Sequence, residues 1–317
     1  MSGTAAASPE VSIIVESYNH AEGSSLDRLT LSLRAALRTA RDHGSTEVLL
    51  ADSSGNPDVR ALLEDDLAQV RHVDASGHRY DDGKQVAVAQ ARGEYVLFLD
   101  GDVIPERDDW AARHVSSLRT GPATSGFSRY EGGFFQRLCT VMDFGFLLPA
   151  TERELRCYAS NNAGFQAGTL VECPVPAGPL RCNCYLHAEQ LRQRGTPARL
   201  VTGATVEHEK QPFWEERFRR GHDQVAACWT NKELPEARLV RLGPLAAPLF
   251  YARDVFLDWR RLMRGRRDLG LGRARAAAGL VLLPILRLAD LPGIVRALIT
   301  PARARIVSPA SQTDPTP

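Results

Sequence analysis

Short apolar runs rich in β-branched residues alternate with helical patterns over the first hundred residues. The runs lie at residues 11–15, 47–52, 70–73 and 95–99. Apolar positions three and four residues apart predict helices between them, near residues 29–40, 58–67 and 84–92. Continuous apolar strands separated by amphipathic helices are typical of a mostly parallel sheet covered by helices on both faces. The sequence therefore predicts an α/β, Rossmann-like fold.

The pattern changes twice further along the chain. After about residue 120, segments rich in glycine and aromatic residues interrupt it, and only residues 198–202 again read as a strand. From Leu242 onward, long apolar helices are interrupted by arginines. We therefore expect a leader without order at residues 1–9, an α/β domain at 10–235, a helical extension at 236–305 and a disordered tail at 306–317.

Polar residues follow the predicted strands at their carboxyl ends, where parallel sheets bind ligands. Asp52 ends the second strand, and Asp100-Gly-Asp102 ends the fourth. Two carboxylates separated by a glycine can turn toward one hard cation, and oxygen ligands suit Mg or Mn. Taken alone, the same residues are more typical of a solvated turn at the end of a strand than of a metal site.

Three segments, with their order and spacing, make the chain resemble family 2 glycosyltransferases of the GT-A fold. They are Val11-Ser-Ile-Ile-Val-Glu-Ser-Tyr-Asn19, Glu47-Val-Leu-Leu-Ala-Asp-Ser-Ser54 and Ala91-Arg-Gly-Glu-Tyr-Val-Leu-Phe-Leu-Asp-Gly-Asp102. The resemblance implies that Ser17, Tyr18 and Asp52 bind the nucleotide. It also implies that Asp100 and Asp102 bind Mn or Mg together with the sugar diphosphate. Many members have a proline where this chain has Glu16.

The resemblance extends to residues outside these segments, each with a simpler alternative. Lys84 would meet the diphosphate, or be a solvated lysine at a helix start. His208 would join the metal ligands, or pack as an ordinary histidine. Asn162 would bind the donor sugar, or form a turn. Arg217 and Arg220, three residues apart, would share a helix face and hold the diphosphate, or lie in water.

One expected residue is missing. Inverting members of the family carry a Glu-Asp pair at the start of a later helix, and its aspartate is the general base. The Leu-Arg-Gly pattern that follows places this pair within Cys182-Asn183-Cys184, which contains no acid. Asn183, Cys184 and the more distant Glu189 are weak candidates, and Asp143 is another. The alternatives are a base from elsewhere, a retaining reaction, or a protein that binds the donor without catalysis.

Charge is unevenly distributed along the chain. Residues 241–317 contain 13 arginines and five aspartates, with no lysine or glutamate. A basic, apolar C-terminal region favours contact with an anionic membrane surface, although a packed appendage with solvated arginines is the alternative. RNA is the other anionic candidate, but we expect no nucleic acid. The longest apolar run, residues 276–286, is too short to span a bilayer.

Together these features predict a glycosyltransferase that uses a UDP, GDP or TDP sugar and an unidentified acceptor, a glycan or lipid-linked molecule. The N-terminus has no secretory signal pattern, so we expect a cytoplasmic protein, peripheral at the inner face of the plasma membrane. The alternative is a catalytically silent nucleotide-sugar-binding partner in a membrane glycan assembly.

Overall fold

The computed structural model describes residues 8–17, 25–65, 67–176, 183–210, 212–232 and 234–300. These residues form two compact units. The α/β unit contains the described residues up to 176 and from 183 to 209, and the helical unit contains those from 210 to 300. The boundary that we expected after residue 235 lies later than this division, because the helix that follows residue 212 packs with the C-terminal helices.

The α/β unit contains nine strands, seven α-helices and a 3-10 turn at Gly145–Leu147 among its described residues. The strands are β1 (Val11–Glu16), β2 (Thr46–Asp52), β3 (Val70–Asp74), β4 (Tyr95–Asp100), β5 (Val103–Pro105), β6 (Ala123–Tyr130), β7 (Arg153–Glu154), β8 (Asn162–Gln166) and β9 (Arg199–His208). The helices are α2 (Leu26–His43), α3 (Pro57–Asp65), α4 (Tyr80–Val88), α5 (Trp110–Leu118), α6 (Phe134–Phe144), α7 (Ala167–Glu172) and α8 (Cys184–Gln193).

One sheet unites these strands in the order β3, β2, β1, β4, β8, β6, β9, β5, with β7 beside β9. The four strands at the β3 end are parallel, and their register places Ile14 opposite Leu49 and Phe98. Strand β8 then runs antiparallel between β4 and β6. The α/β class with helices on both faces is confirmed.

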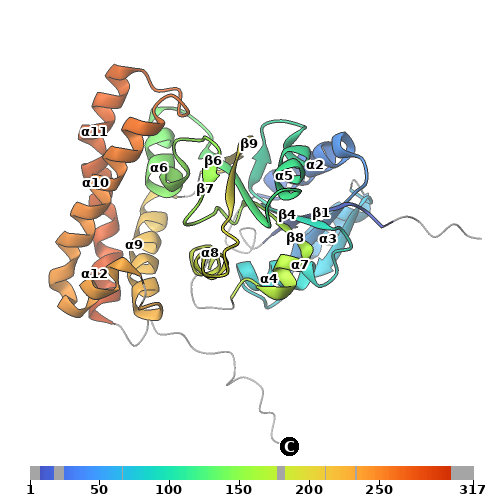
Figure 1. Cartoon of the computed structure of the whole chain (residues 1–317), viewed down its shortest axis with the longest axis horizontal. Coiled ribbons are helices and arrows are strands. Elements are labelled where there is room, and N and C mark those ends of the chain that lie inside the picture. The colour runs from blue at the N-terminus through green and yellow to red at the C-terminus, as the bar shows by residue number, and fades with distance from the viewer. Residues whose placement is uncertain are drawn as a thin grey trace, which may run out of the picture. The chain divides into compact units, whose positions relative to one another are not determined.

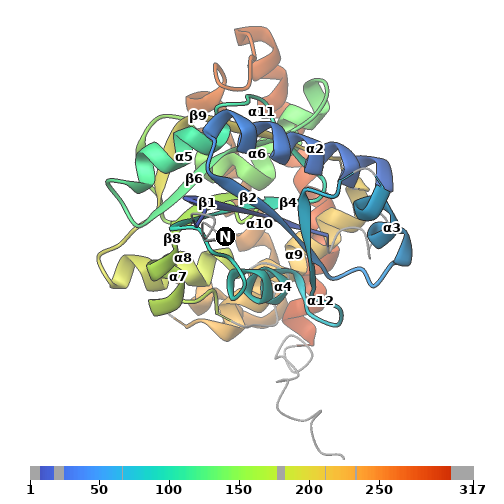
Figure 2. The ribbon, with the colours of Figure 1, turned by 90° about the vertical axis from the view of Figure 1, so that its right-hand side faces the viewer.

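Apolar side chains alternate between the two faces of the central strands because successive residues of a strand point in opposite directions. Val15 and Leu99 face the core beneath α2, α3 and α5, whereas Ile14 and Phe98 face the core beneath α4, α7 and α8. Figure 2 shows α2 and α5 on one side of the strands and α4, α7 and α8 on the other. Because β1, β2 and β4 are parallel, their carboxyl ends lie at the same edge of the sheet.

The helical unit consists of α9 (Phe213–Thr230), a 3-10 segment at Pro235–Ala246, α10 (Ala247–Gly265), α11 (Arg273–Arg287), a 3-10 turn at Leu288–Asp290 and α12 (Leu291–Ile299). Helix α12 packs closely on α9 (Figure 1), where Gly221 faces the Asp290 carbonyl and Gly293 faces the Phe218 carbonyl. Helices α10 and α11 form a hairpin in which Trp259 Nε1 donates a hydrogen bond to the Leu280 carbonyl, 2.8 Å away.

One helical stretch in the described part of the chain, Arg273–Ile299, is long and apolar enough to cross a membrane by length and composition. We expected no such stretch, because Arg287 interrupts the apolar run. The structure continues the helix through Arg287 and pairs this residue with Asp258 and Asp290, at 2.6 and 2.7 Å. The charge of Arg287, which interrupts the apolar run, is therefore neutralised by these aspartates inside the helical unit.

Candidate donor and metal site

The carboxyl ends of β1 and β4 meet at the predicted site. Parallel pairing puts Glu16 beside Asp100, and the Gly101 amide donates a hydrogen bond of 2.7 Å to the Glu16 carbonyl. A Cβ atom at residue 101 would lie 2.9 Å from Leu29 Cδ1 and 3.0 Å from that carbonyl oxygen. Glycine is therefore favoured between the two aspartates, because a larger residue would press on the backbone of β1 and on the Leu29 side chain of α2.

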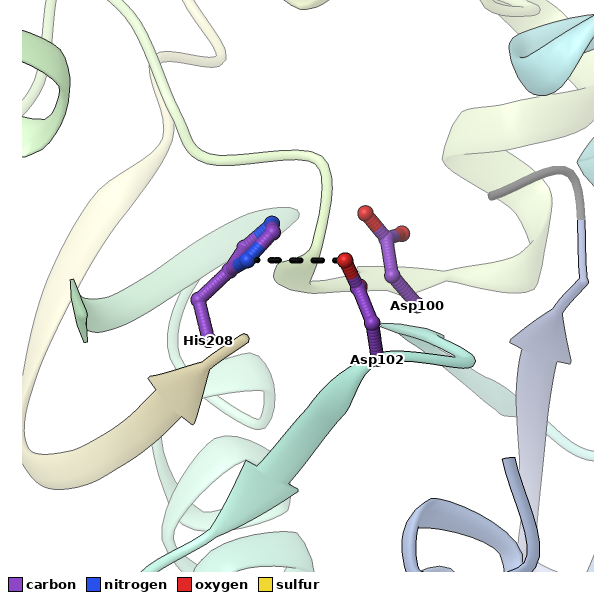
Figure 3. Close-up of side chains that lie close together, drawn as sticks. All are labelled: Asp100, Asp102 and His208. Atoms are coloured by element: carbon purple, nitrogen blue, oxygen red, sulfur yellow. Dashed lines mark ion pairs between the residues drawn. The ribbon is translucent and has the colours of Figure 1, made fainter. Parts of the chain in front are cut away.

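Three potential metal ligands gather at this turn. One ligand atom each from Asp100, Asp102 and His208 lies within 4.8 Å of the other two, and all three residues are buried. Figure 3 shows the two aspartates side by side on the turn between β4 and β5 and the histidine at the end of β9, with a dashed line that marks the ion pair between His208 and Asp102. The amide of Glu209 donates to the Asp102 carbonyl at 3.0 Å, which fastens the end of β9 to the turn.

The His208 ring is held in one orientation. Its Nδ1 lies 2.8 Å from the Glu209 carbonyl oxygen and 3.5 Å from Asp102 Oδ2. The rings of Tyr130 and Phe144 pack against it, with centroids 5.4 and 5.8 Å away. A proton on Nδ1, donated to the carbonyl, leaves the Nε2 lone pair as the ligand. Two carboxylates and one imidazole so arranged fit a divalent cation such as Mn or Mg.

Lys84 lies beside this cluster. Its ammonium is fully buried and donates to Asp100 Oδ1 at 2.7 Å and to the Ser160 carbonyl at 3.0 Å. Burial by itself lowers the pKa of Lys84, but the charges of Asp100, Asp81 and Glu16 oppose it, and the pKa is raised above its ordinary value. The side chain is thus a buried cation among carboxylates.

Asp52 forms a second polar cluster, at the ends of β1, β2 and β3. Its Oδ1 accepts from Ser17 Oγ at 2.9 Å and from Ser54 Oγ at 2.5 Å, and its Oδ2 lies 3.1 Å from His72 Nε2. Burial raises the pKa of Asp52, but the hydrogen bonds from Ser54, His72 and Ser17 outweigh it and lower the pKa overall. Tyr18, the remaining nucleotide candidate, lies outside the described residues.

Asn162 occupies a different environment from the one expected. Its Oδ1 accepts from Trp110 Nε1 at 2.9 Å and lies 3.1 Å from His114 Nε2, while its Nδ2 donates to the carbonyls of Phe127 and Ala204. The residue is fully buried. Because the amide already forms these four contacts inside the core, it joins β8 to β6, β9 and α5 and has no group left for a sugar.

Arg217 and Arg220 lie on α9 in the helical unit. Arg217 is buried with Nη1 3.7 Å from Asp290 Oδ1, and Arg220 Nε donates to Glu216 Oε1 at 2.6 Å. Both arginines therefore have carboxylate neighbours within their own unit. Their predicted contact with a diphosphate rests on their spacing in the sequence and stays a prediction.

Helix α8 begins without an acid of its own, as the sequence indicated. Asn183 precedes its first turn, Cys184 opens it, and Cys182 lies outside the described residues. Glu189, one turn farther along, accepts two hydrogen bonds from Arg192, which lower its pKa and hold its carboxylate at the surface of the helix. The start of α8 is instead hydrogen-bonded to the Asp81 carboxylate, which accepts from the Asn183 amide at 2.5 Å.

Sequence reasoning missed two members of these clusters. Asp81 lies in the first turn of α4, which has no side-chain cap, and its carboxylate accepts a hydrogen bond from the Asn183 amide before α8. His72 gave no signal, because a histidine in a short strand shows no spacing that points to Asp52. Burial of an aspartate in the first turn of a helix can be recognised only from the packed structure.

The model of glycosyl transferase family 2 matches residues 12–169. No curated protein sequence matches the chain.

Solved structures similar to this chain were also found. The mannosyltransferase PcManGT from Pyrobaculum calidifontis, in complex with GDP-Man and Mn2+, has a TM-score of 0.56 and 18% identity over 94% of this chain and 87% of that one. GalNAc-T7, with UDP, GalNAc and Mn2+, has a TM-score of 0.48 and 12% identity over 65% of this chain and 45% of its own. From its matched residues and its fold, the chain belongs to glycosyl transferase family 2.

Proposed function

We propose that this glycosyltransferase moves a sugar from a UDP, GDP or TDP sugar to the hydroxyl group of an acceptor, and that the diphosphate binds at Asp100, Asp102 and His208. The observation that carries the proposal is the convergence of these three buried ligands beside the Lys84 ammonium. The Mn2+ and GDP-Man bound by the similarly folded PcManGT support the same assignment.

Each residue has a distinct part in this proposal. Asp100, Asp102 and His208 would hold Mn or Mg, which neutralises charge on the departing diphosphate. Lys84 fixes the Asp100 carboxylate and adds positive charge on the side of α4. Asp52, kept ionised by its hydrogen bonds, presents a carboxylate to the ribose or base of the nucleotide.

Thermal shift with Mn and each nucleotide sugar tests donor binding. We expect the melting temperature of the wild type to rise with one nucleotide class, and the rise to disappear in Asp100→Ala with Asp102→Ala, because both carboxylate ligands are lost. Asp42→Ala removes an exposed acid from α2 and serves as the matched control. An equal shift in the double variant would exclude the site.

Turnover is the second measurement. Release of the nucleoside diphosphate, followed with a labelled donor sugar and acceptor extracts, distinguishes an enzyme from a silent binder. We expect labelled product with the wild type and none with the double variant. Binding without release or transfer under any acceptor condition would contradict catalysis and favour the silent nucleotide-sugar-binding partner.

We also propose that the helical unit docks on an anionic phospholipid surface, such as the inner face of the plasma membrane, where a lipid-linked acceptor would be presented. Large apolar side chains are exposed along one side of α10 and α11, with Phe256 60%, Met263 52%, Val281 67% and Ile285 57% exposed. An apolar groove between these helices is lined by Phe256, Trp259, Arg260, Met263 and Leu280.

Arginines accompany this apolar surface and favour lipid over a neutral protein partner. Arg260, Arg264, Arg267, Arg273 and Arg275 are all exposed on α10, α11 or the turn between them. Apolar side chains bordered by exposed arginines are typical of helices that lie in the interface of an anionic bilayer. The Arg287 pair with Asp258 and the close packing of α12 on α9 favour this peripheral arrangement over a membrane span.

Flotation on vesicles of phosphatidylcholine and phosphatidylserine tests the surface. We expect full-length protein to float, and Phe256→Glu with Met263→Glu to remain in solution, because two charges would enter the apolar face. Val171→Glu makes the same change at an exposed side chain of α7 in the other unit and should float like the wild type. Failure of the wild type to float, or a dimer in solution that the double variant dissociates, would overturn the proposal.

A further inference from the structure

The start of α8 has no acidic residue of its own but lies beside a carboxylate from α4. No acid stands at Asn183 or Cys184, where the helix begins. The Asp81 carboxylate, supplied by the first turn of α4, lies there instead, with Oδ2 2.5 Å from the Asn183 amide nitrogen and Oδ1 3.2 Å from Ser160 Oγ. A carboxylate has about four lone-pair positions, so these two contacts leave Asp81 able to accept further hydrogen bonds.

Asn183 contributes a second, independent observation. The residue is 2% exposed, and its side-chain Oδ1 is buried with no hydrogen-bond partner among the described residues. Buried polar atoms in folded proteins are nearly always paired, so this acceptor is available to a group that the structure does not contain, either a water or a bound ligand. Because Oδ1 can only accept, the missing group is a donor such as a hydroxyl.

Asp81 is also connected to the donor site. Ser160 Oγ, which lies 3.2 Å from Asp81, is 3.2 Å from Lys84 Nζ, and Lys84 in turn contacts Asp100. One chain of contacts thus runs from the start of α8 to the first metal-ligand candidate. The carboxylate at α8 and the proposed diphosphate site therefore belong to one buried polar network.

We propose that Asp81 is the general base of the transfer reaction, and that Asn183 Oδ1 binds the acceptor hydroxyl beside it. The inference rests on the proposed function, because it assigns residues to the acceptor side of the same site. It also explains why α8 can lack an acid at its start, because α4 supplies the carboxylate there.

The step balances without any further reactant. The acceptor hydroxyl gives its proton to the Asp81 carboxylate while its oxygen forms a bond to the anomeric carbon of the donor. The bond between that carbon and the diphosphate oxygen breaks, and the nucleoside diphosphate leaves with the electron pair. Asp81 later releases the proton to solvent. A single displacement of this kind inverts the configuration of the anomeric carbon.

The protonation behaviour of Asp81 suits this role. Burial raises its pKa to about 6, against the opposing charge of Lys84, and Asp100 adds to the rise. At neutral pH the carboxylate is mostly ionised, yet it is more basic than an exposed aspartate. Burial is thus the largest cause of the raised pKa of Asp81, and Lys84 and Asp100, the two charged residues that face it, act on this pKa in opposite directions.

Asp81→Asn tests the base directly, because the asparagine carbonyl can still accept from the Asn183 amide while it cannot take a proton. We expect donor binding by thermal shift to be unchanged and the turnover rate to fall at least about a hundredfold, in line with the loss of a general base. Asp82→Asn, on the next residue of the same helix, is the matched control and should retain wild-type turnover.

A compensating variant separates a catalytic from a structural role. Adding Asn183→Asp to Asp81→Asn returns a carboxylate to the start of α8, and we expect it to recover at least about tenfold of the lost turnover. Wild-type turnover should decline as the pH falls below about 6, with a product of inverted configuration by NMR.

The outcomes distinguish this inference from the proposed function. No transfer by the wild type contradicts the proposed function. Transfer by the wild type with unchanged turnover in Asp81→Asn, or with retained anomeric configuration, would leave that function intact and overturn the assignment of Asp81.

Discussion

Buried charged side chains are stabilised by partners in both units of this protein. In the α/β unit, Lys84 is surrounded by carboxylates at the proposed donor site. In the helical unit, Arg287 donates to Asp258 through Nε and Nη2, at 2.6 and 3.0 Å, and to Asp290 through Nη1. A buried charge is costly without its partner, so these residues are sensitive positions for substitution.

Asp258→Ala should lower the free energy of unfolding by on the order of 3 to 5 kcal/mol, because it leaves the Arg287 guanidinium buried with one of its two carboxylate partners missing. Urea unfolding followed by circular dichroism measures the change. Arg267→Ala, at an exposed position of the same unit, should stay within about 0.5 kcal/mol of the wild type. Equal effects of the two substitutions would show that the pair contributes nothing.

Asp52 predicts a dependence of stability on pH. Its pKa in the folded protein is lowered below the ordinary value of 3.8, so the folded state favours the ionised form. The resulting stability is present above pH 3.8 and is lost as the pH falls through the lower folded-state pKa.

The free energy of unfolding of the wild type and Asp52→Asn, measured between pH 6 and pH 3, checks this dependence. The advantage of the wild type should shrink toward the acid end of the range. Parallel curves for the two proteins would contradict it.

At the scale of elements, hydrophobic pattern located the strands that are buried on both faces, but not those built from small residues. Strands β1, β2 and β4 are apolar runs and were predicted within one or two residues. Strands β6 and β8 carry serine, glycine and asparagine at buried positions. A Cβ atom at Gly126 would lie 1.8 Å from the Ala204 carbonyl oxygen. Because β9 lies so close, β6 needs small residues at these positions, and its sequence therefore lacks the apolar pattern that predicts a buried strand.

The contact between α9 and α12 gives a prediction at the same scale. Gly221→Ala would place Cβ 2.2 Å from the Asp290 carbonyl oxygen, so the helices must separate. We expect a melting temperature several degrees lower, because the surrounding apolar contacts are lost. Gly168→Ala, in α7 with nothing within 4 Å of the added Cβ, should be neutral or slightly stabilising. Differential scanning calorimetry measures both; equal melting temperatures would contradict the tight contact.

At the scale of the whole molecule, net charge conceals an uneven distribution. The chain carries a formal charge of +1, although residues 241–317 contain 13 arginines and five aspartates. Exposed arginines and apolar side chains lie together on α10 and α11. Attraction to an anionic surface and burial of apolar area therefore both contribute to the proposed membrane contact.

These two contributions respond differently to salt. Raising NaCl from about 0.05 to 0.5 M screens the arginines, so binding to phosphatidylserine vesicles should weaken several-fold. Apolar contact is not screened, so some binding should persist at high salt. Co-sedimentation with vesicles over this salt range measures it. Binding that does not change with salt would contradict the contribution of the arginines.

The sequence alone determined the class of fold, the end of each central strand and the positions of Asp52, Asp100 and Asp102, because these follow from local pattern and from motifs that are continuous in the chain. Tertiary structure decided the rest. It brought His208 to the aspartates from more than a hundred residues away, used the Asn162 amide in the core and turned Asp81 toward α8. Such contacts depend on how helices and strands pack across the sheet, which spacing along one chain does not encode.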